Sequence, residues 1–239
     1  MYILLYQLSL LVSLSSQISI LDRKKLSSCK FNPLCLCSSN GDDLGAVECN
    51  GIELADVPQD LIESRVFALT LSSNSLRVIQ EDRLRNMGCW SVEISRNLLT
   101  RLPPATFSGL ERSVWRLILA GNRFQEIPYT SIQRLNKLNH LDLADNEICE
   151  LDVTQLKTLP PSIKYISLAG NSIASVPEGV FWNLGELTEL DLSRNMIINI
   201  HSMALNTGLP VLATLNLADN LLSKIPFMAI ENLNALKML

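Results

Sequence analysis

Two histidines, His140 and His201, are the only imidazole side chains and so the first candidates for acid–base chemistry. His140 stands two residues before Asp142, and second neighbours on a strand project from the same face. No nucleophile accompanies that pair, and His201 is expected beyond a different strand, so the two histidines do not share a site. The sequence also lacks a glycine-rich phosphate loop, the H-E-x-x-H pattern and the G-x-S-x-G pattern. It therefore predicts a protein that is not an enzyme and that uses no cofactor and no metal.

Four of the six cysteines follow the pattern C-x5-C-x-C-x11-C, at Cys29, Cys35, Cys37 and Cys49. Four cysteines allow three disulfide connectivities, and Cys35 and Cys37 stand too close together to pair comfortably. A zinc site is the alternative interpretation. An oxidising extracellular compartment favours disulfides over that site.

Charge and composition exclude several classes of protein. The 239 residues carry 20 basic and 24 acidic side chains, a net charge of −4, and no clustered basic stripe of the kind that binds nucleic acid. Hydrophobic residues make up 47% of the chain and aromatic residues only 5%, so the interior must be mostly aliphatic. Such a composition indicates a repetitive folded interior rather than disorder.

The first residues resemble a secretory leader. They carry no charge, are mostly apolar from Ile3 to Leu14, and have small residues at Ser13, Ser15 and Ser16. The segment lacks the usual basic start and is too short to span a membrane comfortably. We predict a cleaved signal peptide over residues 1–16, and hence a secreted chain.

An asparagine recurs every 23 to 25 residues. Aliphatic residues or a cysteine stand eight, five and three residues before each one, and aliphatic or aromatic residues stand two and five residues after it. The seven asparagines are Asn74, Asn97, Asn122, Asn146, Asn171, Asn195 and Asn220. Seven copies of L-x-x-L-x-L-x-x-N-x-L in register indicate a leucine-rich repeat.

This pattern predicts an α/β repeat fold, a curved leucine-rich-repeat solenoid with parallel strands on its concave face. The asparagines are expected to form a structural ladder that satisfies backbone groups at each turn. Prolines six residues after an asparagine, such as Pro128 and Pro226, are expected to keep the return segment extended. We expect a cysteine-rich cap at 27–62 and a solenoid at 63–239, with seven repeats and the start of an eighth. The missing carboxyl-terminal cap predicts a fragment of a longer protein. Cys89 and Cys149 fall two repeats apart, so both are expected to be unpaired.

The cysteine pattern resembles the amino-terminal cap of extracellular leucine-rich-repeat proteins, and that resemblance implies the pairs Cys29–Cys37 and Cys35–Cys49. Residues 29–38 (CKFNPLCLCS), 43–47 (DLGAV) and 106–119 (TFSGLERSVWRLIL) further resemble the leucine-rich-repeat cell-adhesion proteins of arthropod photoreceptors. The resemblance implies homophilic adhesion between microvillar membranes, with a lipid (GPI) anchor encoded beyond residue 239. Relatives of this kind are glycoproteins, whereas this chain contains no Asn-x-Ser/Thr sequon.

The strands are expected to expose two kinds of residue to a protein partner, possibly a second copy on an opposing membrane. Three aromatics stand seven residues before an asparagine, and three acids stand four residues before one. They are Phe67, Trp90 and Trp115, and Glu93, Asp142 and Asp191. Exposed aromatics often anchor a partner. The alternatives are that the aromatics pack on the cap or on each other, and that the acids are merely solvated.

Three functions compete at this point. The first is cell adhesion on the outer face of the plasma membrane. The second is the ectodomain of a receptor for a soluble ligand, as in Toll-type receptors. The third is an intracellular scaffold, which the leader and the cysteine cap argue against. No small-molecule substrate and no nucleic acid is expected as a partner.

Overall fold

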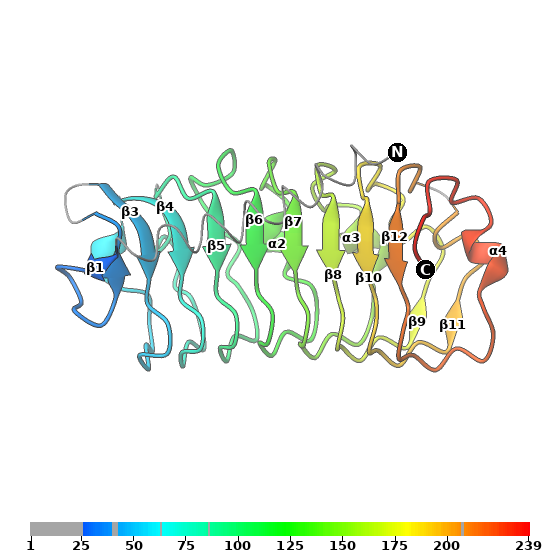
Figure 1. Ribbon diagram of the computed structural model, residues 1–239, viewed down its shortest axis with the longest axis horizontal. Helices are drawn as coiled ribbons and strands as arrows, with labels where there is room; N and C mark the ends of the chain where they lie inside the picture. Colours follow the sequence, from blue (N-terminus) through cyan, green and yellow to red (C-terminus); the bar gives the residue numbers. More distant parts are fainter. Residues whose placement is uncertain (1–25, 40–42, 63, 86, 207) are drawn as a thin grey trace.

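Short strands stand side by side along the whole molecule in one sheet (Figure 1). The computed structural model describes residues 26–239 except 40–42, 63, 86 and 207. The predicted signal peptide lies outside the described residues. The sheet has the order β1-β2-β3-β4-β5-β6-β7-β8-β10-β12. Its strands are β1 (Ser27–Ser28), β2 (Leu36–Cys37), β3 (Asp43–Glu48), β4 (Arg65–Thr70), β5 (Ser91–Glu93), β6 (Arg116–Ile118), β7 (His140–Asp142), β8 (Tyr165–Ser167), β10 (Glu189–Asp191) and β12 (Thr214–Asn216).

The repeat sequence explains this sheet. From β3 onward every strand pairs in parallel with the next repeat's strand, whereas β1, β2 and β3 pair antiparallel within the cap. The aliphatic positions eight, five and three before each asparagine are at most 1% exposed, except half-buried Leu217. Each repeat therefore buries its apolar face against the neighbouring repeats, and one continuous core results. The predicted solenoid is confirmed.

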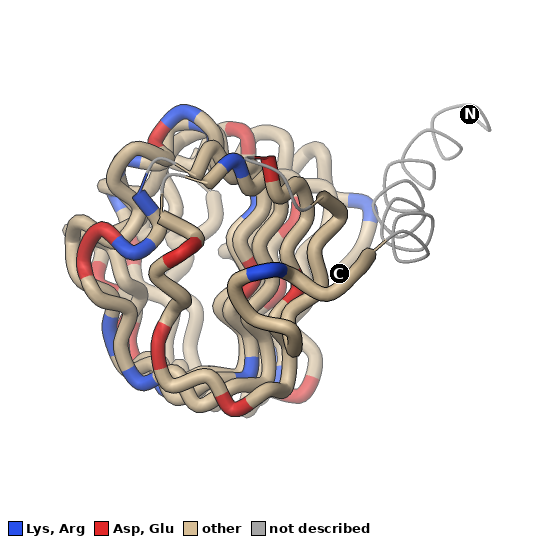
Figure 2. Tube along the Cα trace, turned by 90° about the vertical axis from the view of Figure 1, so that its left-hand side faces the viewer, with Lys and Arg blue, Asp and Glu red and all other residues tan. Residues whose placement is uncertain are grey.

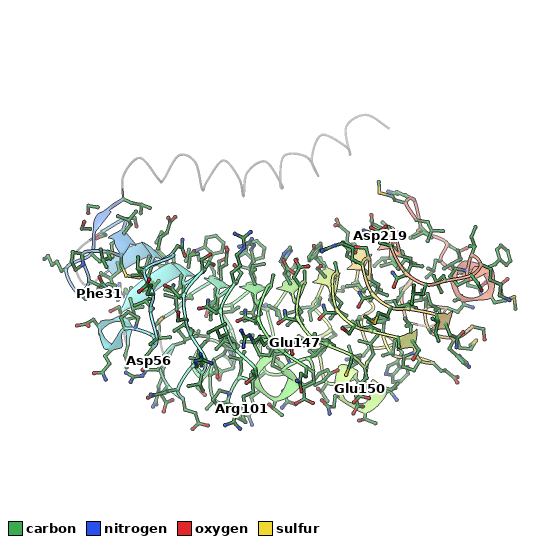
Figure 3. All side chains as sticks on the ribbon, turned by 90° about the horizontal axis from the view of Figure 1, so that it is seen from below. Phe31, Asp56, Arg101, Glu147, Glu150 and Asp219 are labelled. Atoms are coloured by element: carbon green, nitrogen blue, oxygen red, sulfur yellow. A yellow bond between two sulfur atoms is a disulfide. The ribbon has the colours of Figure 1, made fainter. Side chains whose placement is uncertain are left out.

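The opposite side of each coil is irregular and carries short helices. They are the 3-10 helix η2 (Gln59–Leu61), α2 (Tyr129–Ile132), α3 (Val153–Leu156) and α4 (Phe227–Ile230), and a second small sheet joins β9 (Ser175–Val176) to β11 (Asn199–Ile200). Figure 2 looks along the solenoid and shows the coils overlapping around one interior. Figure 3 shows the molecule as an arc, with the strands on its inner side and α2 and α3, near Arg101 and Glu150, on its outer side.

Two prolines act differently from the expectation. The sequence predicts an extended return segment at Pro128 and Pro226, but each directly precedes a short helix, with φ of −76° and −78°. Each proline is the residue before the helix, with ψ of 61° and 60°, and is tolerated there because its missing N–H lies outside the hydrogen bonds of the helix.

Side-chain amides of the seven asparagines join each coil to the preceding one. Asn146 is representative: its Nδ2 donates to the carbonyls of Leu119 in the preceding repeat and Leu143 in its own, and its Oδ1 accepts from the N–H of Phe124. The other six repeat this arrangement. These bonds satisfy backbone groups that the bend would otherwise bury without a partner.

The residue before each ladder asparagine lies in the left-handed region of backbone conformation. Its φ is between 53° and 66° in all seven repeats, at Ser73, Arg96, Gly121, Asp145, Gly170, Arg194 and Asp219. Such a φ strains most residues other than glycine. Only two of the seven are glycines, so the ladder holds five side-chain-bearing residues in this conformation.

The cap closes the amino-terminal end of the core. Disulfides join Cys29 to Cys37 and Cys35 to Cys49, which confirms the implied pairing and rules out the zinc alternative for these four residues. The ladder reaches into the cap, because Asn74 Nδ2 donates to the carbonyl of Cys49 at 2.6 Å. Two disulfides within one short segment indicate an oxidising, extracellular environment.

The remaining two cysteines are free, as predicted. Cys89 occupies a core position, and burial raises the pKa of its thiol to about 12. Cys149 lies exposed on the return side. Among residues 26–239 as described, no helix has the length and apolar character needed to cross a bilayer.

Replacing a ladder asparagine should cost most in the middle of the stack. Asn146→Ala leaves several buried backbone groups unpaired and should lower the free energy of unfolding by about 2–4 kcal/mol. Asn220 makes the same kinds of bond but is only half-buried, so Asn220→Ala should cost less than half as much. Urea unfolding of both variants measures these losses of stability. Equal losses would show that the contribution of a ladder asparagine does not depend on its burial.

Gly170 is expected to be required for two reasons: its φ is left-handed, and there is little room beside it for a Cβ. A Cβ there would overlap Asp145 Oδ1, which is bonded to Arg194 at 2.8 Å. Gly179 has a similar φ of 60° but open space around it. Gly179→Ala should therefore lose only the left-handed cost of about 1–2 kcal/mol, and Gly170→Ala should lose more.

The same comparison in an Asp145→Ala background separates the two effects. Without the carboxylate, Gly170→Ala should cost no more than Gly179→Ala in thermal unfolding. A difference that persists in this background would show that the excess does not come from the Asp145 carboxylate.

Candidate functional site

The concave face presents rows of side chains that run across the strands. Strand residues six and four positions before each asparagine point to this face, and residues seven before line its edge. The structure places Phe67 on β4, and Trp90 and Trp115 directly before β5 and β6. Their backbones are consecutive in the sheet, because Trp90 N–H donates to the carbonyl of Phe67 and Trp115 N–H to that of Trp90.

Two of the three aromatics predicted for this edge stack on each other. The rings of Trp90 and Trp115 are nearly parallel, at 4°, with centroids 5.5 Å apart. Trp115 is 38% exposed and Phe67 47% exposed, whereas Trp90 is half-buried. We call Phe67, Trp90 and Trp115 the aromatic edge. It combines packing within the protein with apolar surface left open to solvent.

The three predicted acids are not simply solvated. Glu93 accepts hydrogen bonds from the hydroxyls of Ser72 and Ser95, both at 3.1 Å, and its other oxygen lies 3.7 Å from Arg116. Asp142 and Asp191 each use one oxygen to accept the N–H two residues further on, at 2.9 Å. Such bonds are Asx turns, which fix the bend after a strand. The acids therefore have local structural roles.

Some strand positions expected to be exposed are buried. Ser91, Ile118 and Ser167 are only 7%, 6% and 3% exposed. Each is short or apolar beside longer neighbours, as where Arg116 reaches back to the hydroxyl of Ser91 at 3.5 Å. The periodicity shows which way a side chain points, but not whether a neighbour in another repeat covers it.

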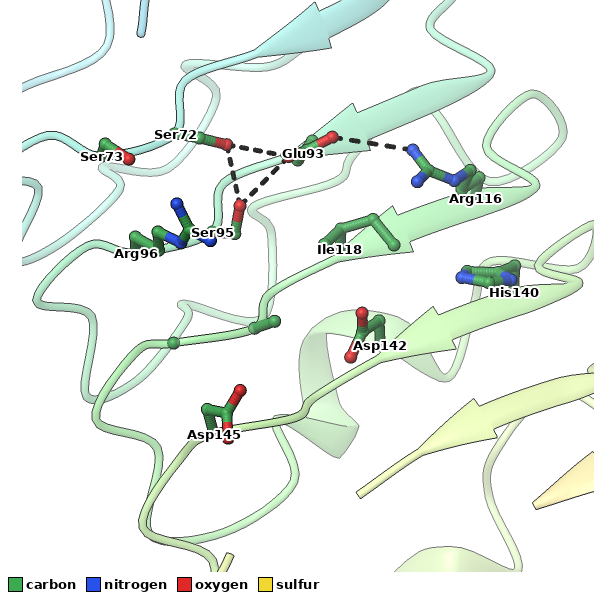
Figure 4. A pocket seen from close by; sticks show the side chains of 12 residues that line it. Ser72, Ser73, Glu93, Ser95, Arg96, Arg116, Ile118, His140, Asp142 and Asp145 are labelled. Carbon is green, nitrogen blue, oxygen red and sulfur yellow. Dashed lines mark hydrogen bonds and ion pairs between the residues drawn. The ribbon is translucent and has the colours of Figure 1, made fainter. Parts of the chain in front are cut away.

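A hollow of about 420 Å³ opens over β6 (Figure 4). Repeat three supplies its small or apolar lining, Ile118, Ala120 and Gly121. Repeat three also supplies Arg116, and the rest of the polar lining comes from repeats one, two and four: Ser72, Ser73, Glu93, Ser95, Arg96, His140, Asp142 and Asp145. We call this the Ile118 hollow. The predicted contact residues Glu93 and Asp142 line it, whereas Asp191 and the aromatic edge do not.

His140 is a feature of this face that the sequence analysis set aside. Its ring stacks on Tyr165 with centroids 4.1 Å apart and planes at 3°. Burial, and secondarily the charge of Arg116, lower the pKa of His140 to about 4. Burial also raises the pKa of Asp142 and, with help from the Asp142 charge, that of Tyr165. The signal that could have found the stack is the adjacency of two aromatic rings six residues before consecutive asparagines.

His201 lies elsewhere, 3.9 Å from Glu178 near the β9–β11 sheet. The two histidines thus belong to different surroundings. Within the described part of the chain, no three His, Cys, Asp or Glu residues are grouped so that they could hold a metal ion.

Comparison with known proteins agrees with the architecture. The leucine-rich-repeat family model matches residues 151–197. Chaoptin of Drosophila melanogaster is 42% identical over 115 residues, which are 48% of this chain and 9% of chaoptin. The chain thus corresponds to a small part of that much longer relative.

Two solved structures share the fold. A leucine-rich-repeat protein of Leptospira interrogans superposes with a TM-score of 0.66 at 25% identity, over 77% of this chain and 46% of that one. TLR13 in its complex with ssRNA13 superposes with a TM-score of 0.62 at 22% identity, over 77% of this chain and 30% of that one. The stacked parallel strands, the asparagine ladder and these comparisons together identify the chain as a leucine-rich-repeat solenoid.

Proposed function

We propose that this chain is an extracellular protein-binding module that acts in cell adhesion, most simply by homophilic contact between opposing membranes. The observation that carries the proposal is the aromatic edge beside a polar concave face. Large apolar rings that remain open to solvent, next to charged groups in a rigid frame, are the kind of surface that anchors a protein partner.

The charge of the concave face narrows the kind of partner. At the described strand positions six and four before the asparagines, the acids are Glu93, Asp142, Glu189 and Asp191, and the base is Arg116. Because its pKa is about 4, His140 is neutral at physiological pH and adds no positive charge. The face therefore suits a partner that presents basic groups. It does not suit a phosphate backbone, so the RNA in the TLR13 complex is no guide to a ligand here.

The cellular setting is part of the proposal. Two disulfides in the cap favour a place outside the cytosol, and the match to chaoptin adds the resemblance to photoreceptor adhesion proteins. The adhesion would operate between microvillar membranes, with a GPI anchor beyond this chain. Partner contact through Phe67, Trp90, Trp115, Glu93, Asp142 and Asp191, with a signal peptide removed from residues 1–16, belongs to the same proposal.

A receptor ectodomain that binds a soluble ligand is the second candidate, since TLR13, which was solved in a complex with ssRNA13, has the same fold. The two functions differ in whether copies of the chain bind one another. That difference can be measured directly with the purified chain.

The first test concerns the charge of the face. In a His201→Gln variant His140 is the only histidine, and its carbon-13 ring resonance should titrate near pH 4. Because the folded pKa lies below the unfolded value of 6.5, the associated stability is complete above pH 6.5 and is lost as the pH falls toward 4. Arg116→Gln should raise the pKa of His140 only part of the way toward 6.5, since burial is the larger cause of its lowering. A midpoint at or above 6.5 would contradict a neutral His140.

The second test concerns the aromatic edge. Beads coated with the chain should aggregate, and Trp90→Ser with Trp115→Ser should reduce aggregation at least about fivefold, a loss that a hot spot of 1–2 kcal/mol explains. Trp182→Ser is the matched control, because Trp182 is 57% exposed near Lys157, away from the concave strands.

Thermal unfolding of each variant shows whether it is folded, and Trp115→Ser alone spares half-buried Trp90. Aggregation unchanged in both tryptophan variants would remove the aromatic edge from the contact. Beads that never aggregate, while the chain binds a soluble ligand, would favour the receptor function.

A further inference from the structure

The Ile118 hollow lies where repeat three is apolar and its neighbours are mostly polar. At the positions four, two and one before the asparagine, repeat three has Ile118, Ala120 and Gly121. Repeats two and four have charged or polar groups at most of these positions, including Glu93 and Asp142 at the first of them. The result is a narrow apolar strip with a carboxylate on either side, in which Ala120 and Gly121 are half-buried and Ile118 is 6% exposed.

The acids around the hollow are not equally available. Glu93 is already engaged by two hydroxyls and by Arg116. Asp145 is bonded to Arg194 at 2.8 Å. Asp142 uses one oxygen in its Asx turn with Ala144, and its other oxygen has no hydrogen bond or ion pair among the described residues. Asp142 is therefore the acid left to receive an incoming cation.

The fold does not need the charge of Asp142. Asn216 holds the equivalent turn with its amide oxygen, which accepts the N–H of Ala218 at 3.1 Å. A neutral oxygen thus performs the structural task in the same column. The turn therefore requires an oxygen at this position but not its negative charge, which leaves the Asp142 charge available to a ligand.

We infer that the Ile118 hollow receives a lysine or arginine side chain of the partner, its alkyl stem lying on Ile118 and Ala120 and its cationic head on the free oxygen of Asp142. This inference rests on the proposed function, because it names the chemistry of that partner. Long basic side chains suit the hollow since their stems are apolar and their heads are charged. His140 forms part of the wall and, being stacked on Tyr165, is held rigidly.

Two arginines also line the hollow, and their positions set the direction of the ligand. Arg116 contacts Glu93 at 3.7 Å and Ser91 at 3.5 Å, so its guanidinium is drawn toward repeat two, although its charge still acts on Asp142 and His140. Arg96 lies two strands from Asp142 across the sheet, which is about 9–10 Å by strand spacing. The cation must therefore sit at the Asp142 end, with the uncharged part of the ligand toward Gly121.

The experiment uses the full chain with isoleucine methyl groups labelled for NMR. The probes are N-acetyl-lysine-N-methylamide and its uncharged counterpart, N-acetyl-norleucine-N-methylamide. The lysine probe should shift the Ile118 methyl saturably, and the norleucine probe should bind at least about fivefold more weakly. Asp142→Asn keeps the turn oxygen and should weaken lysine binding by a similar factor.

Asp191→Asn is the matched control, since Asp191 makes the same turn bond to Ser193 but does not line the hollow. It should leave lysine binding unchanged. Equal shifts with both probes, or undiminished binding in Asp142→Asn, would overturn the inference.

The bead assay separates this inference from the proposed function. If Asp142→Asn loses the lysine probe and also reduces aggregation, the hollow serves the partner. If the lysine probe fails to bind while aggregation still depends on the tryptophans, the inference is overturned and the proposed function stands. If the probe binds but Asp142→Asn aggregates normally, the partner does not use the hollow and the inference is likewise overturned.

Discussion

The asparagine ladder is the interaction on which the rest of this structure depends. Each amide donates to carbonyls in two successive repeats and accepts an N–H from the earlier one, as Asn146 does with Leu119, Leu143 and Phe124. These bonds hold a bend that includes a left-handed residue, which is an arginine in two of the seven repeats. Without the ladder the bend would bury unpaired backbone groups, and nothing would offset the strain of its left-handed residue. The ladder thus permits side chains, and even large charges, at a position where glycine would otherwise be required.

A frame fixed in this way turns single residues into local surface features. Because every repeat places its strand in the same register, residues at one motif position form a straight row across the concave face. A run of similar residues then makes a patch, as at the aromatic edge, and an apolar repeat between polar ones lines a depression, as at Ile118, Ala120 and Gly121. Neither feature needs any change in the backbone. The surface of the concave face therefore depends on which residues occupy each row.

The sequence predicts the frame well and the surface only in part. The repeat period located the strands, the core columns and the asparagines, because each is set by interactions that recur identically in every repeat. The cap pairing came from a resemblance, since four cysteines alone allow three connectivities. The sequence did not predict the stack of His140 on Tyr165, the burial of Ile118 or the engagement of Glu93 by Ser72. Each depends on the lengths of side chains in neighbouring repeats, which periodicity does not encode. The helices that follow Pro128 and Pro226 were missed for a related reason, because a proline suits both an extended segment and a helix start.

The row that contains Asp142 shows how a residue's role in stability can be separated from its role in recognition. In three repeats the turn after the strand uses a side-chain oxygen that accepts an N–H, from Asp142, Asp191 or Asn216. Whether that oxygen carries a charge matters little to the turn but decides what the face attracts. Residues in this row can therefore exchange among aspartate and asparagine while the fold is kept, which the ladder asparagines cannot do. A solenoid built on this plan can acquire or lose a partner by changing the charge of one half-buried side chain, at a cost in stability limited to the desolvation of that group.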